Sequence, residues 1–195
     1  MARYQYKIGD QINVTSGTGT ISSSGTTITG VGTNFDPETP AGTVIHAAGQ
    51  TLVVASVTND TSMTVVTAPT VALSGASFTT TAMVNVETVI GDERFPPRST
   101  FAPWAATVDL GNGTSRAMGR PSAAWYWGLL TQAGRNALRA YCTGKSARVY
   151  IATRKNDNSD AYTTYDAVML WPDEEDRQAS RRIGFVIQFR DLFAL

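Results

Sequence analysis

Residues 17–35 read GTGTISSSGTTITGVGTNF, and glycine, serine and threonine outnumber all other residues in this stretch. Glycine at this density serves either a loop whose backbone amides bind a phosphate or the turns of small β-hairpins. A P-loop needs a lysine followed by serine or threonine, and a dinucleotide-binding turn needs a third glycine that opens a helix. No lysine lies between Lys7 and Lys145, and no helical pattern follows the stretch. The sequence therefore predicts β-hairpins here.

The residues on either side continue this pattern. Apolar side chains alternate with threonine and serine over residues 17–22, 26–31, 43–47, 51–57 and 62–66, and turn residues separate these segments. Short alternating strands at such spacing predict a small all-β sandwich or barrel without a helix. Its expected core is thin and consists of Ile21, Ile28, Phe35, Val44, Leu52, Val54, Val57, Met63 and Val65.

Charge density marks a boundary near Ala82. Residues 1–82 carry two basic and four acidic side chains, whereas residues 83–195 carry fourteen basic and twelve acidic ones. We therefore expect two differently built units, an accessory module over residues 1–82 and a second domain over residues 83–195. The first 14 residues or so form either an arm or a strand of the second domain.

The second unit has one helical segment and several strong strands. Residues 132–142 carry an apolar stripe at helical spacing, Thr131 stands where an N-cap belongs, and Gly144 stands where a left-handed C-terminal residue belongs. Residues 147–154, 162–171 and 183–193 alternate between apolar and polar side chains. This pattern predicts an antiparallel meander of at least three strands, hence a β-sandwich with one flanking α-helix.

Bulk composition narrows the class of protein. The 195 residues are 42% hydrophobic with a formal net charge of zero, which argues against disorder and against a broad nucleic-acid-binding face. The single cysteine, Cys142, excludes an intramolecular disulfide and a cysteine-based zinc site. The N-terminus lacks the apolar stretch of a signal peptide, and no run is long enough to span a membrane. We expect a soluble protein without an export signal.

No combination of residues predicts catalysis, a cofactor or a metal ion. His46 is the only histidine and lies in a strand pattern without a partner that would activate a nucleophile. Asp92 and Glu93 are adjacent, so on a strand they point to opposite faces and do not flank one glycosidic bond. Residues 156–160 read NDNSD, which lacks the glycine and the terminal glutamate of a calcium loop. The basic side chains of residues 135–154 fit the solvated sides of a helix and a strand.

Two loops are candidates for contacts between subunits. The first is the acidic run Asp173, Glu174, Glu175 and Asp176, which Arg181 and Arg182 follow. Its side chains either form a solvated hairpin tip or meet charges on a neighbouring copy. The second is the extended segment Phe95-Pro96-Pro97, because its two prolines lack amide donors and cannot form a central strand.

Residues 17–66 resemble a small β module that recurs in the tail proteins of tailed bacteriophages. The matching residues are Gly32-Thr33-Asn34-Phe35 and the run VTNDTSMT at residues 57–64. The second unit is similar in layout to the tail-tube and distal-tail family, through residues 125–130, 138–141, 146–151, 165–169 and 185–189. Members of that family are β-sandwiches with one flanking helix that assemble into rings around the tail channel.

The resemblance implies a structural protein of the virion. The expected function is to form a ring, most simply a hexamer, at the distal end of the tail tube or in the baseplate. The expected partners of this ring are the neighbouring tube or baseplate proteins. DNA would pass through the channel without specific binding, and no membrane would take part. A major tail-tube subunit is the close alternative. A carbohydrate- or receptor-binding module that uses Trp104, Trp125, Tyr126 and Trp127 is a less favoured one, and a hydrolase is disfavoured.

Overall fold

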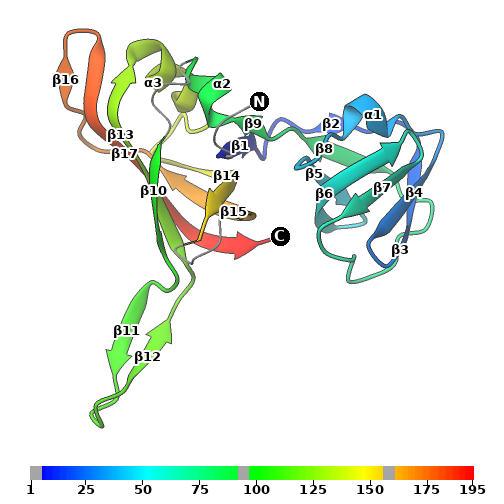
Figure 1. Ribbon diagram of the computed structural model, residues 1–195, viewed down its shortest axis with the longest axis horizontal. Helices are drawn as coiled ribbons and strands as arrows, with labels where there is room; N and C mark the ends of the chain where they lie inside the picture. Colours follow the sequence, from blue (N-terminus) through cyan, green and yellow to red (C-terminus); the bar gives the residue numbers. More distant parts are fainter. Residues whose placement is uncertain (1–5, 92–96, 156–160) are drawn as a thin grey trace. The chain divides into compact units, whose positions relative to one another are not determined.

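The chain folds into two compact units, of which one is inserted into the other (Figure 1). The computed structural model describes residues 6–91, 97–155 and 161–195. Unit 1 contains residues 6–8 and 84–194, and unit 2 contains residues 9–83. Lys7 pairs with Asn85 and Ile8 pairs with Val84, antiparallel, so unit 2 leaves and rejoins unit 1 on neighbouring strands. The sequence boundary expected near Ala82 lies beside the second of these crossings.

Unit 2 is an antiparallel β unit that curls back on itself. Its strands are β2 (Thr15–Ser16), β3 (Thr20–Ser24), β4 (Thr27–Val31), β5 (Val44–Ala47), β6 (Gln50–Asn59), β7 (Ser62–Val65) and β8 (Phe78–Thr81), in the spatial order β2-β8-β5-β6-β7-β4-β3. Ile21 in β3 and Ala76, just before β8, exchange backbone hydrogen bonds of 2.8 and 2.9 Å. These bonds link one end of the sheet to a segment beside the other end.

The core of unit 2 contains the residues that alternation predicted. Seven of the nine expected residues belong to the buried core cluster, and Val57 packs partly buried against it. Val44 is buried outside this cluster, and its neighbour Ile45, on the other face of β5, takes the core position. Ile45, Ala47, Leu73 and Phe78 complete this core. The expectation of no helix was wrong in one place, since α1 (Phe35–Glu38) makes a single turn that places the ring of Phe35 in the core. Four residues are too few for a periodic sequence pattern.

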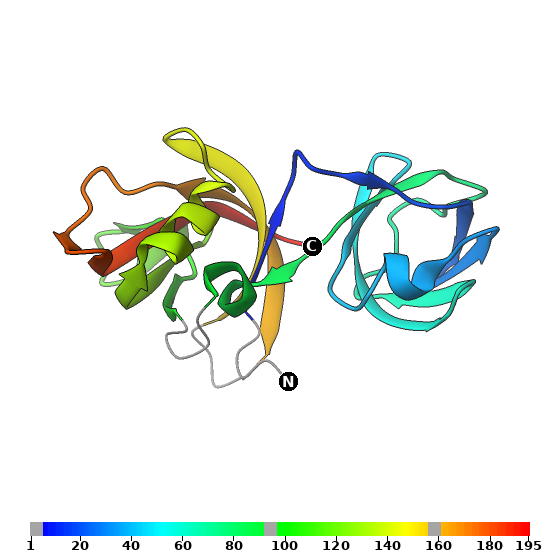
Figure 2. The same ribbon diagram turned by 90° about the horizontal axis from the view of Figure 1, so that it is seen from above.

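Unit 1 is built on a strongly curved sheet (Figure 2). Its strands are β1 (Lys7–Asp10), β9 (Val84–Asn85), β10 (Arg98–Ala102), β13 (Ser122–Thr131), β14 (Ser146–Arg154), β15 (Tyr162–Leu170), β16 (Arg177–Gln178) and β17 (Arg181–Ala194), in the spatial order β10-β13-β17-β15-β14-β1-β9, with β16 beside β17. The predicted antiparallel meander is confirmed, because β14 pairs with β15 and β15 pairs with β17. The fold is mainly β, as predicted.

An aromatic cluster on β13 forms the centre of the core of unit 1. Trp125 and Trp127 are fully buried, and the Trp125 ring meets that of Phe189 edge to face at 4.6 Å. The indole Nε1 of Trp125 donates a hydrogen bond to Oγ1 of the buried Thr153 at 3.2 Å. This cluster ties β13 to its neighbour β17 and to β14, which is not next to β13 in the sheet.

Two helices accompany the sheet of unit 1, where one was predicted. The helix α3 (Gln132–Arg139) begins as expected, because the Thr131 hydroxyl accepts a hydrogen bond from the Gly134 amide at 3.1 Å. It ends at Arg139, three residues before the end at residue 142 that the sequence predicted. Gly144 does not adopt a left-handed conformation; instead the Arg139 guanidinium donates to the carbonyls of residues 143 and 144. The second helix, α2 (Val86–Ile90), packs on α3 where a side chain at Gly134 would crowd Ile90.

Candidate interaction sites

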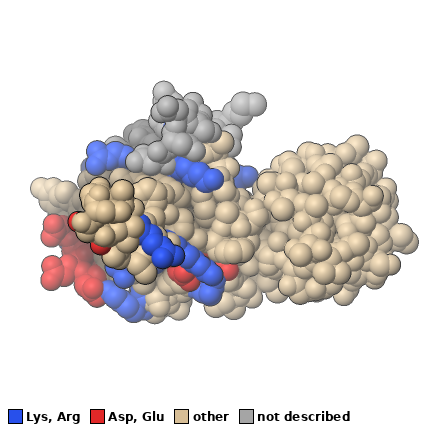
Figure 3. Space-filling model, turned by 90° about the horizontal axis from the view of Figure 1, so that it is seen from below, with Lys and Arg blue, Asp and Glu red and all other residues tan. Residues whose placement is uncertain are grey.

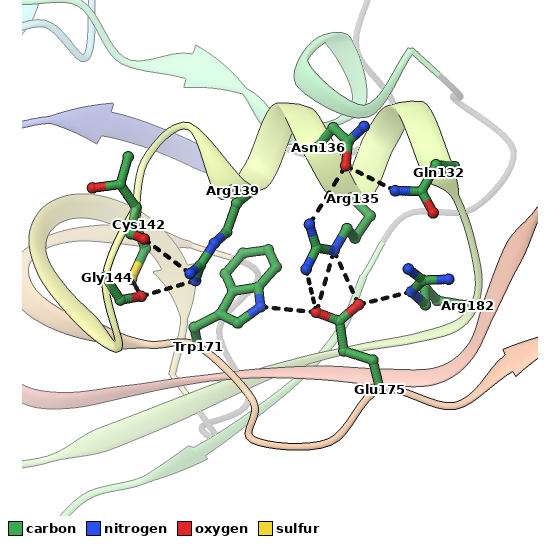
Figure 4. A network of polar contacts seen from close by, with 10 residues as sticks. Gln132, Arg135, Asn136, Arg139, Cys142, Gly144, Trp171, Glu175 and Arg182 are labelled. Carbon is green, nitrogen blue, oxygen red and sulfur yellow. Dashed lines mark hydrogen bonds and ion pairs between the residues drawn. The ribbon is translucent and has the colours of Figure 1, made fainter.

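A half-buried carboxylate, that of Glu175, holds the acidic loop of unit 1 in place (Figure 4). Glu175 accepts from two arginines, with 2.6 Å between its Oε1 and Nη2 of Arg135 and 2.7 Å between its Oε2 and Nε of Arg182. The indole Nε1 of Trp171 donates to the same Oε1 at 2.9 Å. The side chains of Arg135, Glu175 and Arg182 are 22%, 15% and 11% exposed. Loss of one partner from such an enclosed, hydrogen-bonded group would leave a charge without compensation, which is costly.

Arg135, Trp171, Glu175 and Arg182, which we call the Glu175 cluster, shift the pKa values of their own ionisable groups. Hydrogen bonds from Arg135, and then from Arg182 and Trp171, lower the pKa of Glu175 from 4.5 to about 2 against the opposing effect of burial. The same hydrogen bond raises the pKa of Arg135. The guanidinium of Arg139 lies 4.7 Å from the Trp171 ring centre, a cation–π distance. The loop after β15 is therefore fixed to α3 and to the start of β17.

The residues proposed from sequence as subunit contacts divide into three groups. Glu175 and Arg182 are bound within the chain, and Asp173 pairs with Lys145. Glu174, Asp176 and Arg181 are exposed on the surface of unit 1. Pro97 is buried, while Phe95, Pro96, Asp92, Glu93 and residues 156–160 lie outside the described residues. Sequence alone gave no signal that Arg135 and Trp171 are the partners of Glu175.

A long hairpin projects from unit 1 and was not singled out from the sequence. Between β10 and β13 the chain forms β11 (Ala106–Asp109) and β12 (Ser115–Met118), a two-stranded sheet that extends away from the curved sheet of unit 1 (Figure 1). All nineteen residues of 102–120, which we call the arm, are exposed. The turn at residues 111–113 contains two glycines with positive φ, as hairpin turns require.

One face of the arm carries Val108, Leu110 and Met118 together with the charged side chain of Arg116. Ala106 pairs with Met118 and Val108 pairs with Arg116, so Val108 and Met118 point to the same side. Leu110, two residues beyond Val108, continues that face, and its amide donates to the Thr114 carbonyl at 2.9 Å. Val108, Leu110 and Met118 are 44%, 54% and 50% exposed. Thr107 and Ala117 form the opposite face.

A hollow lies on unit 1 at the root of the arm. Its volume is about 480 Å³, and its lining includes the small residue Ala124 of β13, whereas the side chain of the neighbouring Ala123 belongs to the core on the other face of the strand. Its lining also includes Tyr126, Arg190 and Arg120. The rim is ordered by a 3.4 Å ion pair between Arg120 and Asp191 and by a cation–π contact of Arg120 with Phe193.

The surface of unit 2 is chemically different from that of unit 1. No lysine or arginine occurs between residues 9 and 83, and the face shown at the right of Figure 3 is free of coloured side chains, whereas charged side chains gather on unit 1. His46 lies 3.3 Å from the hydroxyl of Thr51 and 3.4 Å from that of Thr81, and burial lowers its pKa. These contacts join β5 to its neighbours β6 and β8, so they fit a histidine that supports the sheet.

No family model, no curated protein and no solved structure matches this chain. Within residues 6–91, 97–155 and 161–195, no group of three or more histidine, cysteine, aspartate or glutamate side chains is placed to hold a metal ion. Among the same residues, no helix has the length and apolar character needed to cross a membrane.

Proposed function

We propose that the chain is a structural subunit of a bacteriophage tail, and that unit 1 assembles into a ring at the distal end of the tail tube or in the baseplate. The observation that carries the proposal is the open edge of the sheet of unit 1. Among the described strands, β10 pairs only with β13, so the other side of its five residues has no strand beside it. Such an edge is a template for pairing with another chain unless it is covered.

Ring closure supplies a cover for that edge. In a head-to-tail ring each copy presents one surface to the next copy and receives a different surface from the previous one. Unit 1 has both kinds of surface, an unpaired β10 and a projecting arm that follows it directly in the chain. Unit 2 is inserted through a pair of neighbouring strands and would decorate the ring or bridge to other tail proteins.

The major tail-tube subunit is the second candidate, because the same edge and arm would serve stacked rings equally well. The carbohydrate-binding alternative keeps only two of its four aromatic residues, the half-buried Tyr126 and the exposed Trp104. Trp125 and Trp127 are buried, at 0% and 1% exposed, and cannot stack on a sugar, which leaves Trp104 as the one exposed tryptophan of the four. A single exposed indole on a hairpin is a common feature of a protein interface.

Electron microscopy of the purified chain tests the proposal. We expect closed single rings, most simply of six copies, at micromolar concentration. Long tubes would favour the tail-tube subunit over the distal ring. A population that stays monomeric at the highest concentration reached would contradict both assignments, since neither is compatible with a chain that does not assemble.

A further inference from the structure

The hollow at the root of the arm brings polar side chains of three neighbouring strands together. Ala124 of β13 pairs with Thr100 of β10 on one side and with Gln188 of β17 on the other, so these side chains share one face of the sheet. Ser122 and Arg190 lie two residues further along β13 and β17 and line the same hollow. Hydroxyl, amide and guanidinium groups therefore meet in a space of about 480 Å³, a volume typical of small-molecule sites.

Positive charge exceeds negative charge in this hollow. Arg120 and Arg190 line it, and Asp191 is the one carboxylate among its lining residues. Asp191 lies 3.4 Å from Arg120. Arg190 donates to the neutral Oε1 of Gln188 at 3.3 Å and, within the described part of the chain, to no carboxylate. A guanidinium without a carboxylate partner in a concave site is a preformed contact for an anion.

The backbone at Asp191 has an unusual conformation. Strand β17 contains one extra residue between its pairs with Val168 and Asp166 of β15, which makes a β-bulge. Asp191 lies in this bulge with a φ of 57°, a left-handed conformation that residues other than glycine rarely adopt. Bulges re-aim side chains beside binding sites, and left-handed residues are frequent at ligand clamps. Here the bulged Asp191 meets Arg120, which holds that guanidinium at the rim of the hollow.

We propose that the hollow binds a small organic anion whose carboxylate or phosphate group pairs with Arg190 and Arg120. An arginine presents parallel N–H donors that match either group. The hydroxyls of Thr100 and Ser122 line the same hollow and can donate to the remaining oxygens. Tyr126 also lines it, and a tyrosine ring offers an apolar surface to the body of the ligand. This inference goes beyond ring formation and does not depend on it.

Matched ligands separate the charge of the anion from its body. Glucuronate, glucose 6-phosphate and glucose share a sugar ring and differ in the charged group, whereas inorganic phosphate has the charge without the ring. Isothermal titration calorimetry on the full chain measures each dissociation constant. We expect one of the two sugar anions to bind, and glucose and inorganic phosphate to bind at least about 10-fold more weakly. Which anion binds more tightly shows whether the site prefers a carboxylate or a phosphate.

Two substitutions in the hollow should act in opposite directions. Arg190→Gln removes the cation that lacks a carboxylate partner and should weaken anion binding at least about 10-fold. Asp191→Asn removes the competing negative charge and should tighten it about 2- to 3-fold, since asparagine tolerates the left-handed backbone. The matched control Arg181→Gln removes an exposed charge at the start of β17, outside the hollow, and should leave the dissociation constant within about 2-fold. Thermal unfolding shows whether each variant remains folded.

Four results would overturn the inference. Absence of binding by both sugar anions would show that the hollow is not an anion site, and glucose that binds as tightly as they do would show that charge is not recognised. Inorganic phosphate that binds as tightly as glucose 6-phosphate would show that the site takes a free ion and not an organic anion. Equal weakening by Arg190→Gln and Arg181→Gln would show a general attraction to basic surface. None of these results bears on ring formation, which electron microscopy tests separately.

Discussion

Unit 1 and unit 2 are both antiparallel β units, but their sheets end differently. In unit 2 the sheet curls until Ile21 bonds to Ala76, and the strand at its other end, β2, has only two residues. In unit 1 the sheet stays open and ends in the five-residue β10, from which the arm follows. Closed or very short edges protect a β unit from pairing with other chains, whereas a longer open edge invites it. This difference is the reason why we propose that unit 1, and not unit 2, carries the assembly.

The two units also differ in their charged side chains. Unit 2 has no lysine or arginine, so its polar surface is made mainly by threonine and serine. Unit 1 uses its charges partly inside, in the Glu175 cluster, and partly on its surface. A unit whose charged groups fix a loop and whose exposed arm projects outward is suited to specific contacts.

Trp125→Ala should destabilise unit 1 by about 3–5 kcal/mol, because it opens a cavity in the core and removes the hydrogen-bond donor to Thr153. Unit 2 has a separate core, so its amides should keep their protection. Hydrogen exchange followed over both units measures the two effects in one experiment. The control Trp104→Ala removes the exposed indole and should change stability by less than about 1 kcal/mol. Equal loss of protection in both units would refute their independence.

Glu175→Gln should destabilise unit 1 by about 2 kcal/mol, because it leaves the guanidinium groups of Arg135 and Arg182 without a counter-charge. Denaturant unfolding at pH 7 measures this difference. Glu174→Gln, one residue away and exposed, is the matched control and should change stability by less than about 0.5 kcal/mol. If both variants behave alike, the cluster does not hold the loop.

The same cluster predicts how stability depends on pH. Since the folded pKa of Glu175 is about 2 and the ordinary value is 4.5, its contribution is complete above about pH 4.5 and is lost as the pH falls toward 2. The stability difference between the wild-type chain and Glu175→Gln should therefore shrink over that interval. A difference that stays constant from pH 5 to pH 2 would contradict the assigned pKa.

Thr131→Ala should cost unit 1 about 1 kcal/mol, because the hydroxyl that caps α3 is lost. Thr131→Ser keeps the hydroxyl and should restore most of that stability. Thermal unfolding of the two variants checks the effect. Since α3 belongs to unit 1, the cap should have no influence on the unfolding of unit 2, and an influence there would weaken the division between the units.

Local patterns in the sequence predicted much of the fold. Alternation located the strands of the meander and the core of unit 2, and Thr131 marked the start of α3. The insertion of unit 2 was not predictable, because the pairing of Ile8 with Val84 joins residues 76 positions apart and leaves no local signal. The short helix α2 was not predicted either, because five residues are too few to show the periodic pattern of apolar side chains that indicates a helix.

The candidate sites were harder to predict than the fold. In the run Asp173-Glu174-Glu175-Asp176 all four side chains are acidic, and only the tertiary structure shows that Glu175 alone meets Arg135 and Arg182. The arm contains an ordinary alternation around a glycine turn, which predicts a hairpin. That no other strand covers the face with Val108 and Leu110 is a property of the folded unit, so exposure at Leu110 could not be read from the sequence.

The most direct test of the division between the units is to remove unit 2. Residues 9–83 can be replaced by Asn-Gly, since Ile8 and Val84 are paired neighbours and a two-residue turn joins such strands. Sedimentation velocity would then compare the shortened chain with the full chain. If unit 1 carries the assembly, both chains form oligomers of the same copy number, with dissociation constants within about 3-fold. A shortened chain that is folded but monomeric would contradict this account.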